Sequence, residues 1–124
     1  MQNKGATGLR RIVLAAGYSW KGFVAAFRYE AAFRQELAVA LLGLGLALWL
    51  AETSTEFLLL VVPLLLMLLA ELANSAIEAT VDRFGDEIHE LSGRAKDMGS
   101  AMTFVSFCIA GLCWIVILGE KFLR

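Results

Sequence analysis

Three long apolar stretches dominate the pattern of hydrophobic and polar residues along the chain. They run from Leu37 to Ala51, from Phe57 to about Ile77 and from Ala101 to Gly119. A helix needs about 20 predominantly apolar residues to cross a bilayer, so the third stretch is long enough by itself. The first two reach that length only with the polar residues at their ends. The pattern therefore predicts three transmembrane helices, at about 30–51, 57–81 and 97–119.

An amphipathic pattern precedes the first apolar stretch. Between Leu9 and Phe27 apolar side chains recur at helical spacing, and the basic side chains lie off that stripe. Such a helix is typical of a segment that lies in the membrane interface with its cations near anionic headgroups. We therefore expect an amphipathic surface helix at about residues 6–28, and one all-α membrane domain over residues 1–124.

Composition and charge narrow the class of protein. The chain is 59% hydrophobic with a mean hydropathy of +0.69, which is too apolar for an ordinary soluble domain. The net charge of −1 argues against a nucleic-acid partner, which would require a strongly basic surface. The N-terminus lacks the compact layout of a cleavable signal peptide.

The distribution of basic residues predicts the orientation in the membrane. Residues 1–36 carry more Lys and Arg than acids, which places that end in the cytoplasm by the positive-inside rule. A loop predicted from Asp82 to Asp97 then lies on the same side, and the short acidic connector from Glu52 to Glu56 lies outside. Lys121 also falls outside, as a departure from the rule.

The last apolar stretch contains both cysteines. Cys108 and Cys113 are five residues apart, which places them about 140° apart on a helix and disfavours a disulfide between them. We expect two buried, inert thiols.

Acidic residues enter the second apolar stretch while its hydrophobic pattern continues. On a helix, Glu71, Asn74, Glu78 and Asp82 fall within roughly 80° of one another. Ionisable groups at membrane depth are costly and mark a functional site. The alternative is a polar helix-packing patch, for which a Ser or Asn would suffice.

The residue types on this face suit phosphoryl transfer onto a lipid. Glu30 and Glu78 end neighbouring helices at matching depth, and Mg²⁺ is usually held by one or two carboxylates together with substrate phosphates. Glu71 lies roughly 10 Å deeper, where a carboxylate is placed to accept a proton from a lipid hydroxyl. Arg11 and Lys96 are available to neutralise phosphate charge.

Several residues also have simpler interpretations. Arg83, Asp86 and Glu90 are expected in a solvated loop, as is the lone His89. Each Trp is expected as an interface anchor or a lipid contact, namely Trp20, Trp49 and Trp114. Three short helices enclose several charges poorly, so we expect a homo-oligomer, with the small pair Gly43 and Ala47 permitting close helix contact.

Four motifs resemble the prokaryotic integral-membrane diacylglycerol kinase family of Gram-negative type, and the resemblance covers nearly the whole chain. They are Ala16-Gly-Tyr-Ser-Trp-Lys-Gly22, Glu30-Ala-Ala-Phe-Arg-Gln-Glu36, Glu71-Leu-Ala-Asn-Ser-Ala-Ile-Glu-Ala79 and Glu90-Leu-Ser-Gly-Arg-Ala-Lys-Asp-Met-Gly-Ser100. The resemblance implies a homotrimer whose sites are shared between protomers, in the bacterial inner (cytoplasmic) membrane, with the N-terminus and active site on the cytoplasmic side. It implies transfer of the γ-phosphoryl group of MgATP to the primary hydroxyl of diacylglycerol, giving phosphatidic acid.

The resemblance also implies residue roles. Glu71 matches the general base, Asn74 a polar residue of the active site, and Glu30 and Glu78 the pair that holds ATP-bound Mg²⁺. The implied ATP-binding residues are Arg11, Tyr18, Glu30, Glu78, Glu87, His89, Lys96 and Asp97. The implied lipid-binding residues are Ala15, Trp20, Glu36, Glu71, Ser100 and Trp114.

Three other functions remain open at this point. An undecaprenol-type lipid kinase would use the same chemistry on a different acceptor. A small proton-coupled transporter would also place acids within the membrane, although it would need substrate access from both faces. A non-catalytic membrane scaffold would keep its function after Glu71→Gln.

Overall fold

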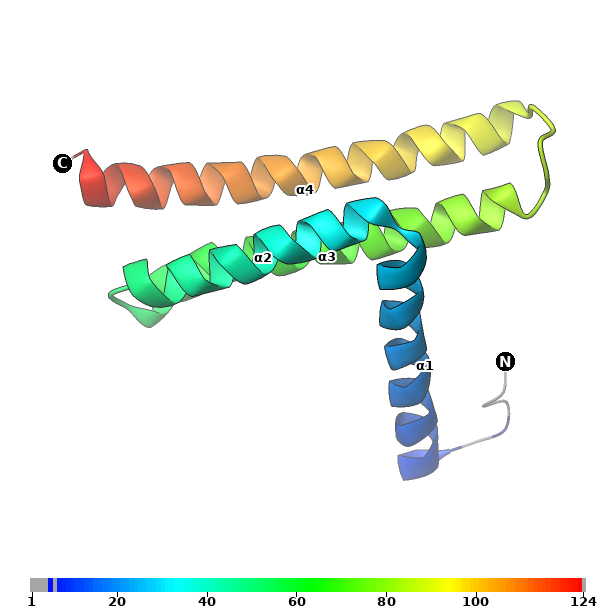
Figure 1. The fold of residues 1–124 in the computed structure, drawn as a ribbon, viewed down its shortest axis with the longest axis horizontal. Helices are drawn as coiled ribbons and strands as arrows, with labels where there is room; N and C mark the ends of the chain where they lie inside the picture. Colours follow the sequence, from blue (N-terminus) through cyan, green and yellow to red (C-terminus); the bar gives the residue numbers. More distant parts are fainter. Residues whose placement is uncertain (1–4, 6, 124) are drawn as a thin grey trace.

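The computed structural model describes residues 5 and 7–123, and its regular structure is entirely helical. The four helices are α1 (Gly8–Tyr29), α2 (Ala31–Leu50), α3 (Ser54–Asp82) and α4 (Glu90–Phe122). Helix α3 packs against both α2 and α4, whereas α1 projects sideways from the bundle (Figure 1). Helices α2, α3 and α4 are each long and apolar enough to cross a membrane, in agreement with the expected number of spans.

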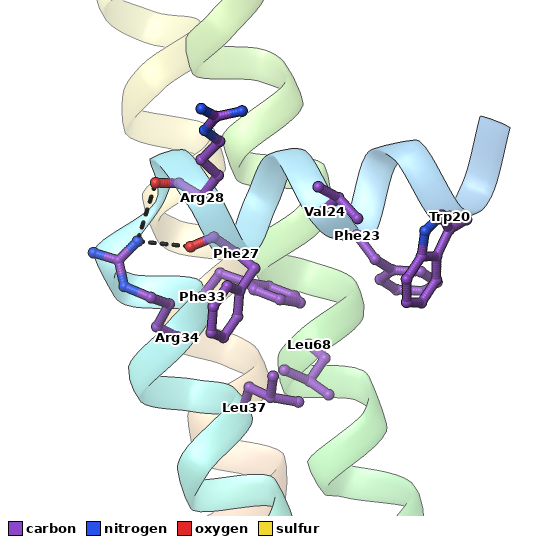
Figure 2. A pocket seen from close by; sticks show the side chains of 9 residues that line it. All are labelled: Trp20, Phe23, Val24, Phe27, Arg28, Phe33, Arg34, Leu37 and Leu68. Atoms are coloured by element: carbon purple, nitrogen blue, oxygen red, sulfur yellow. Dashed lines mark hydrogen bonds between the residues drawn. The ribbon is translucent and has the colours of Figure 1, made fainter. Parts of the chain in front are cut away.

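A single residue joins α1 to α2. Glu30 has an extended backbone, with φ −116° and ψ 104°, and so separates two helices that would otherwise be continuous. The guanidinium of Arg34 donates to the carbonyls of Phe27 at 2.7 Å and Arg28 at 3.3 Å (Figure 2). These are carbonyls of the last turn of α1, which have no partner within the helix. Arg34 therefore caps the end of α1. It also fixes the bend between α1 and α2 at Glu30, which we call the elbow. The first two residues of the expected surface helix fall before Gly8, and residue 6 lies outside the described residues.

The turn between α2 and α3 is held by a cap and by a cation from α4. Thr53 caps α3 by accepting from the backbone N–H of Glu56 at 3.1 Å. Lys121, near the end of α4, lies 3.1 Å from Glu52 and 2.9 Å from Glu56. The acids of the turn between α2 and α3 therefore neutralise Lys121, the basic residue that departs from the predicted charge distribution.

Helix α4 begins earlier than the polar pattern predicts. The loop expected from Asp82 to Asp97 is confined to residues 83–89, because α4 starts at Glu90. His89 is the N-cap, and its Nδ1 accepts from the backbone N–H of Leu91 at 3.1 Å. The charged residues after it form exposed helical turns, so the loop interpretation of Glu90 is wrong, while Arg83 and Asp86 do lie in the loop.

Small residues bring the three long helices together. One core cluster contains Ala40, Leu64, Met67 and Ala110, and a second contains Ala47, Leu60 and Ile117. A Cβ at Gly43 would come within 2.5 Å of a methyl group of Leu64. The small residues Gly43 and Ala47 of α2 therefore pack against α3 of the same protomer.

An indole crosses from α4 to α3. Trp114 donates its Nε1–H to the carbonyl of Leu60 at 2.9 Å. Pro63 lies within the same stretch of α3 and lacks a backbone N–H, so the helical ladder is interrupted there. The carbonyl that loses its helical donor at Pro63 is that of Leu59, so the indole bond to Leu60 ties α4 to α3 beside the break and does not fill it.

The two cysteines differ in burial. Both are free, but Cys108 is exposed and Cys113 is half-buried. The expectation of two buried thiols is wrong for Cys108, because that position on α4 faces away from α3. Many large apolar side chains also point outward, including Leu42, Trp49 and Ile115, as expected for helices that face lipid or another subunit.

The indole hydrogen bond generates a stability prediction. We expect Trp114→Phe to lower the free energy of unfolding by about 1 kcal/mol, because the ring remains while the donor to Leu60 is lost. The measurement is an unfolding titration with dodecyl sulfate in detergent micelles. Trp49→Phe is the matched control, since Trp49 is 77% exposed on α2. Equal losses in the two variants would contradict the assigned role.

Candidate active site

Glu71 and Asn74 lie on the face of α3 that packs toward the other helices, whereas Glu78 is half-buried and Asp82 is exposed. Glu71 is 4% exposed and Asn74 is 9% exposed. Ser75 donates its hydroxyl to Glu71 at 3.4 Å, and the Nδ2 of Asn74 donates to Glu78 at 3.3 Å. Each carboxylate thus receives a hydrogen bond from a side chain one turn away, which fixes its orientation.

Helix α2 contributes a second buried carboxyl group. Glu36 is 7% exposed, it lies beside Glu71, and its Oε1 has no hydrogen-bond partner. The Oδ1 of Asn74 is likewise buried without a partner. Buried polar atoms are nearly always hydrogen-bonded, so two unpartnered oxygens near Glu71 are typical of a site made for a ligand or for protons.

Glu30 faces the same acids from the elbow. Burial raises the pKa of the Glu30 carboxyl, and the negative charges of Glu78, Glu71 and Asp82 raise that pKa further. Glu30 also lines a cavity of about 400 Å³ between α1 and α3, together with Tyr29, Ser75 and Ala76. The carboxylates repel one another, and the ammonium of Lys96, which pairs with Asp82, compensates part of this repulsion.

A polar hollow of about 290 Å³ lies at the loop between α3 and α4. Three of the expected ATP contacts line it, namely Glu87, His89 and Lys96. Lys96 forms an ion pair with Asp82 at 2.7 Å, and both side chains are largely exposed. The loop and the start of α4 thus bring together the Glu87 carboxylate, the His89 imidazole and the Lys96 ammonium.

An apolar hollow of about 760 Å³ lies between α1 and α2 (Figure 2). Trp20, an expected lipid contact, lines it. Sequence patterns did not single out the other lining residues as a site, although Phe23 and Phe27 belong to the apolar stripe of α1. The full lining is Trp20, Phe23, Val24, Phe27, Arg28, Phe33, Arg34, Leu37 and Leu68.

The remaining expected site residues are dispersed in the single chain. Arg11, Ala15 and Tyr18 lie on α1, where the Lys21 ammonium stacks 5.7 Å from the Tyr18 ring centroid. Asp97 and Ser100 lie exposed on α4. Trp114 is half-buried deep in the bundle, far along α4 from the loop. These residues line none of the three hollows described above.

The fold and the acids define a helical membrane protein with a carboxylate-rich site near one end of its spans. The family model for prokaryotic diacylglycerol kinase matches residues 17–118. The chain therefore belongs to the prokaryotic diacylglycerol kinase family.

Individual relatives agree with this assignment. The diacylglycerol kinase of Escherichia coli (strain K12) is 50% identical over 116 residues, covering 94% of this chain and 95% of the relative. That of Pseudomonas aeruginosa is 50% identical over 115 residues, covering 93% and 94%. That of Haemophilus influenzae is 46% identical over 108 residues, covering 87% and 92%.

The environment of Glu30 generates a pH prediction. A carboxyl whose pKa is higher in the folded than in the unfolded state destabilises the fold when it is ionised. That destabilisation is complete above the raised pKa of Glu30 and absent below the ordinary pKa of a Glu carboxyl. With a chelator present, we expect Glu30→Gln to raise the free energy of unfolding at neutral pH by less than about 1 kcal/mol, because the group is partly solvated.

The measurement is the free energy of unfolding of wild type and Glu30→Gln at pH 7 and at about pH 4. The difference between the two proteins should vanish at the lower pH. Glu120→Gln, at the opposite end of the bundle, controls for loss of a surface acid. A constant loss of stability in Glu30→Gln at both pH values would contradict the prediction.

Proposed function

We propose that this chain transfers the γ-phosphoryl group of MgATP to the primary hydroxyl of diacylglycerol, giving phosphatidic acid. The observation that carries the proposal is the match to the family over residues 17–118, with relatives named diacylglycerol kinase at about half identity. The buried acids of α3 agree with it, because phosphoryl transfer to a lipid requires a proton acceptor at membrane depth.

Glu71 is the proposed general base. It is buried, it is held by the hydroxyl of Ser75, and it lies on the membrane side of Glu78. A lipid hydroxyl can reach this depth while its acyl chains stay in the bilayer. Asn74 is the proposed active-site amide, because its Nδ2 orients Glu78 from the same face.

Glu30 and Glu78 are the proposed holders of Mg²⁺. Their charges face each other across the elbow, and their mutual repulsion fits a divalent cation. No cluster of three or more His, Cys, Asp or Glu side chains able to hold a metal ion occurs within residues 7–123. The donor set therefore suits a cation that arrives with phosphate oxygens, as Mg²⁺ does on ATP. When bound, Mg²⁺ would neutralise charge on the transferring phosphoryl group.

The loop hollow is the proposed nucleotide region. Lys96 and His89 offer donors for phosphate oxygens, and Glu87 lines the same space. The further proposed ATP contacts are Arg11, Tyr18 and Asp97. Arg11 and Tyr18 lie on α1 away from this loop, so a complete nucleotide site fits the sharing of sites between protomers.

The hollow between α1 and α2 suits the lipid. Its lining is almost wholly apolar, and it opens beside the helix that carries Glu36. Ala15, Trp20, Glu36, Ser100 and Trp114 are proposed to contact the lipid together with Glu71. Trp114 would do so through its ring edge, since its N–H already binds Leu60.

We also propose a homotrimer in the bacterial inner membrane, with α1 in the cytoplasmic interface. Large apolar side chains of α1 remain exposed in the single chain, such as Leu9 and Trp20. An interface would cover them, and headgroups would meet the cations of the opposite face. The extension of α3 and α4 past the elbow then lies on the cytoplasmic side (Figure 1).

The direct test is ATP-dependent phosphate transfer in mixed micelles, with diacylglycerol and undecaprenol offered separately and Mg²⁺ present or chelated. We expect Mg²⁺-dependent transfer to diacylglycerol. Transfer to undecaprenol alone would support the alternative acceptor. Proton flux in liposomes without ATP, with no transfer to either lipid, would support a transporter.

The proposed roles divide between two acids of the same helix. We expect Glu71→Gln to lower kcat by about 10²–10⁴-fold with little change in MgATP affinity, because it removes a proton acceptor. We expect Glu78→Gln mainly to weaken MgATP binding. Steady-state kinetics against MgATP, with equilibrium nucleotide binding, separates these effects.

Glu120→Gln is the control, since it removes an exposed acid from the far end of α4. Equal loss of MgATP affinity in Glu71→Gln and Glu78→Gln would refute the division of labour. An unchanged kcat in Glu71→Gln would refute the role of this acid as the general base.

A further inference from the structure

Helix α4 approaches the amide of Asn74 at a glycine. A Cβ added at Gly99 would collide with the Oδ1 of Asn74; the next atoms would be the Cγ of Asn74 at 3.3 Å and the Cδ1 of Ile77 at 3.7 Å. Gly99 is among the few buried residues of α4. The backbone of α4 therefore lies directly against the Asn74 side chain.

Backbone conformation does not explain this glycine. Gly99 lies within a helix and does not have a positive φ. Glycine inside a helix is less favourable than alanine by about 1 kcal/mol. The other glycines of α4 have open space where a Cβ would stand, at Gly93, Gly111 and Gly119. Among the α4 glycines, only Gly99 makes room for a neighbouring side chain.

The contact orients the Asn74 amide. Its Oδ1 faces Gly99 and has no hydrogen-bond partner, while its Nδ2 donates to Glu78 at 3.3 Å. Only weak Cα–H donors of a glycine face the oxygen, so the amide keeps its nitrogen on the carboxylate. A side chain at position 99 would displace the oxygen and withdraw the nitrogen from Glu78.

We infer that Gly99 is a positioning residue: it seats Asn74 against α4 and, through Asn74, fixes the Glu78 carboxylate that takes the metal–nucleotide complex. The chain of contacts runs from the α4 backbone through one amide to one carboxylate. It gives the backbone of α4 a role in the acidic site, beside the ion pair that Lys96 of the same helix forms with Asp82. The inference rests on the proposed role of Glu78 in holding MgATP.

The test compares Gly99→Ala with Gly111→Ala, alone and in the Asn74→Ala background. Both substitutions add one methyl group to α4, but only position 99 has a neighbour in the way. The readouts are binding of Mn²⁺–ATP, followed by electron paramagnetic resonance of Mn²⁺, and the split between KM for MgATP and kcat. Helix content and unfolding in micelles report whether each variant folds.

We expect Gly99→Ala to weaken Mn²⁺–ATP binding about tenfold, the loss of one hydrogen bond to a charged group, and Gly111→Ala to leave it unchanged. In the Asn74→Ala background, Gly99→Ala should have no further effect, because the colliding amide is gone. Wild-type binding by a folded Gly99→Ala variant would overturn the inference. So would an undiminished effect in the Asn74→Ala background.

Folding failure is also informative. If Gly99→Ala does not fold, Asn74→Ala should restore its folding by removing the collision; a double variant that also fails to fold would overturn the inference. If wild type itself does not bind Mn²⁺–ATP, the proposed function has failed. The further inference fails in a different way, when wild type and Gly99→Ala bind Mn²⁺–ATP equally well.

Discussion

Ionised carboxylates lose much of their hydration inside a bilayer, and this loss constrains the whole site. Glu36 and Glu71 are both buried, on helices of membrane-spanning length. No Lys or Arg of the described chain forms an ion pair with either acid. Glu71 is supported by a small neutral group instead, the Ser75 hydroxyl. The Oε1 of Glu36 is buried without any hydrogen-bond partner.

Contacts within one helix could be predicted from sequence. The helical period places Glu71, Asn74 and Glu78 on one face, and the structure joins Asn74 to Glu78 one turn apart. The three spans are equally local, because each depends on a continuous run of apolar residues. The family motifs are also continuous runs of sequence, so the resemblance to the lipid kinase family is visible without any contact between helices.

Contacts between helices could not be predicted in this way. Nothing in the sequence indicates that the guanidinium of Arg34 turns back onto α1, or that Trp114 reaches the carbonyl of Leu60. The start of α4 at Glu90 was missed because its first turns are charged, and charge was interpreted as loop. Gly99 belongs to one of the family motifs, but the sequence does not indicate why a glycine stands there, because the reason is the close approach of Asn74 on α3.

The one-residue joint at Glu30 has a mechanical consequence. Helix α1 cannot change its tilt against the bundle without a change in the backbone dihedrals of Glu30 or of its immediate neighbours. Glu30 carries one of the carboxylates whose charge acts on that of Glu78. A change in the tilt of α1 would therefore also change the distance between these two carboxylates.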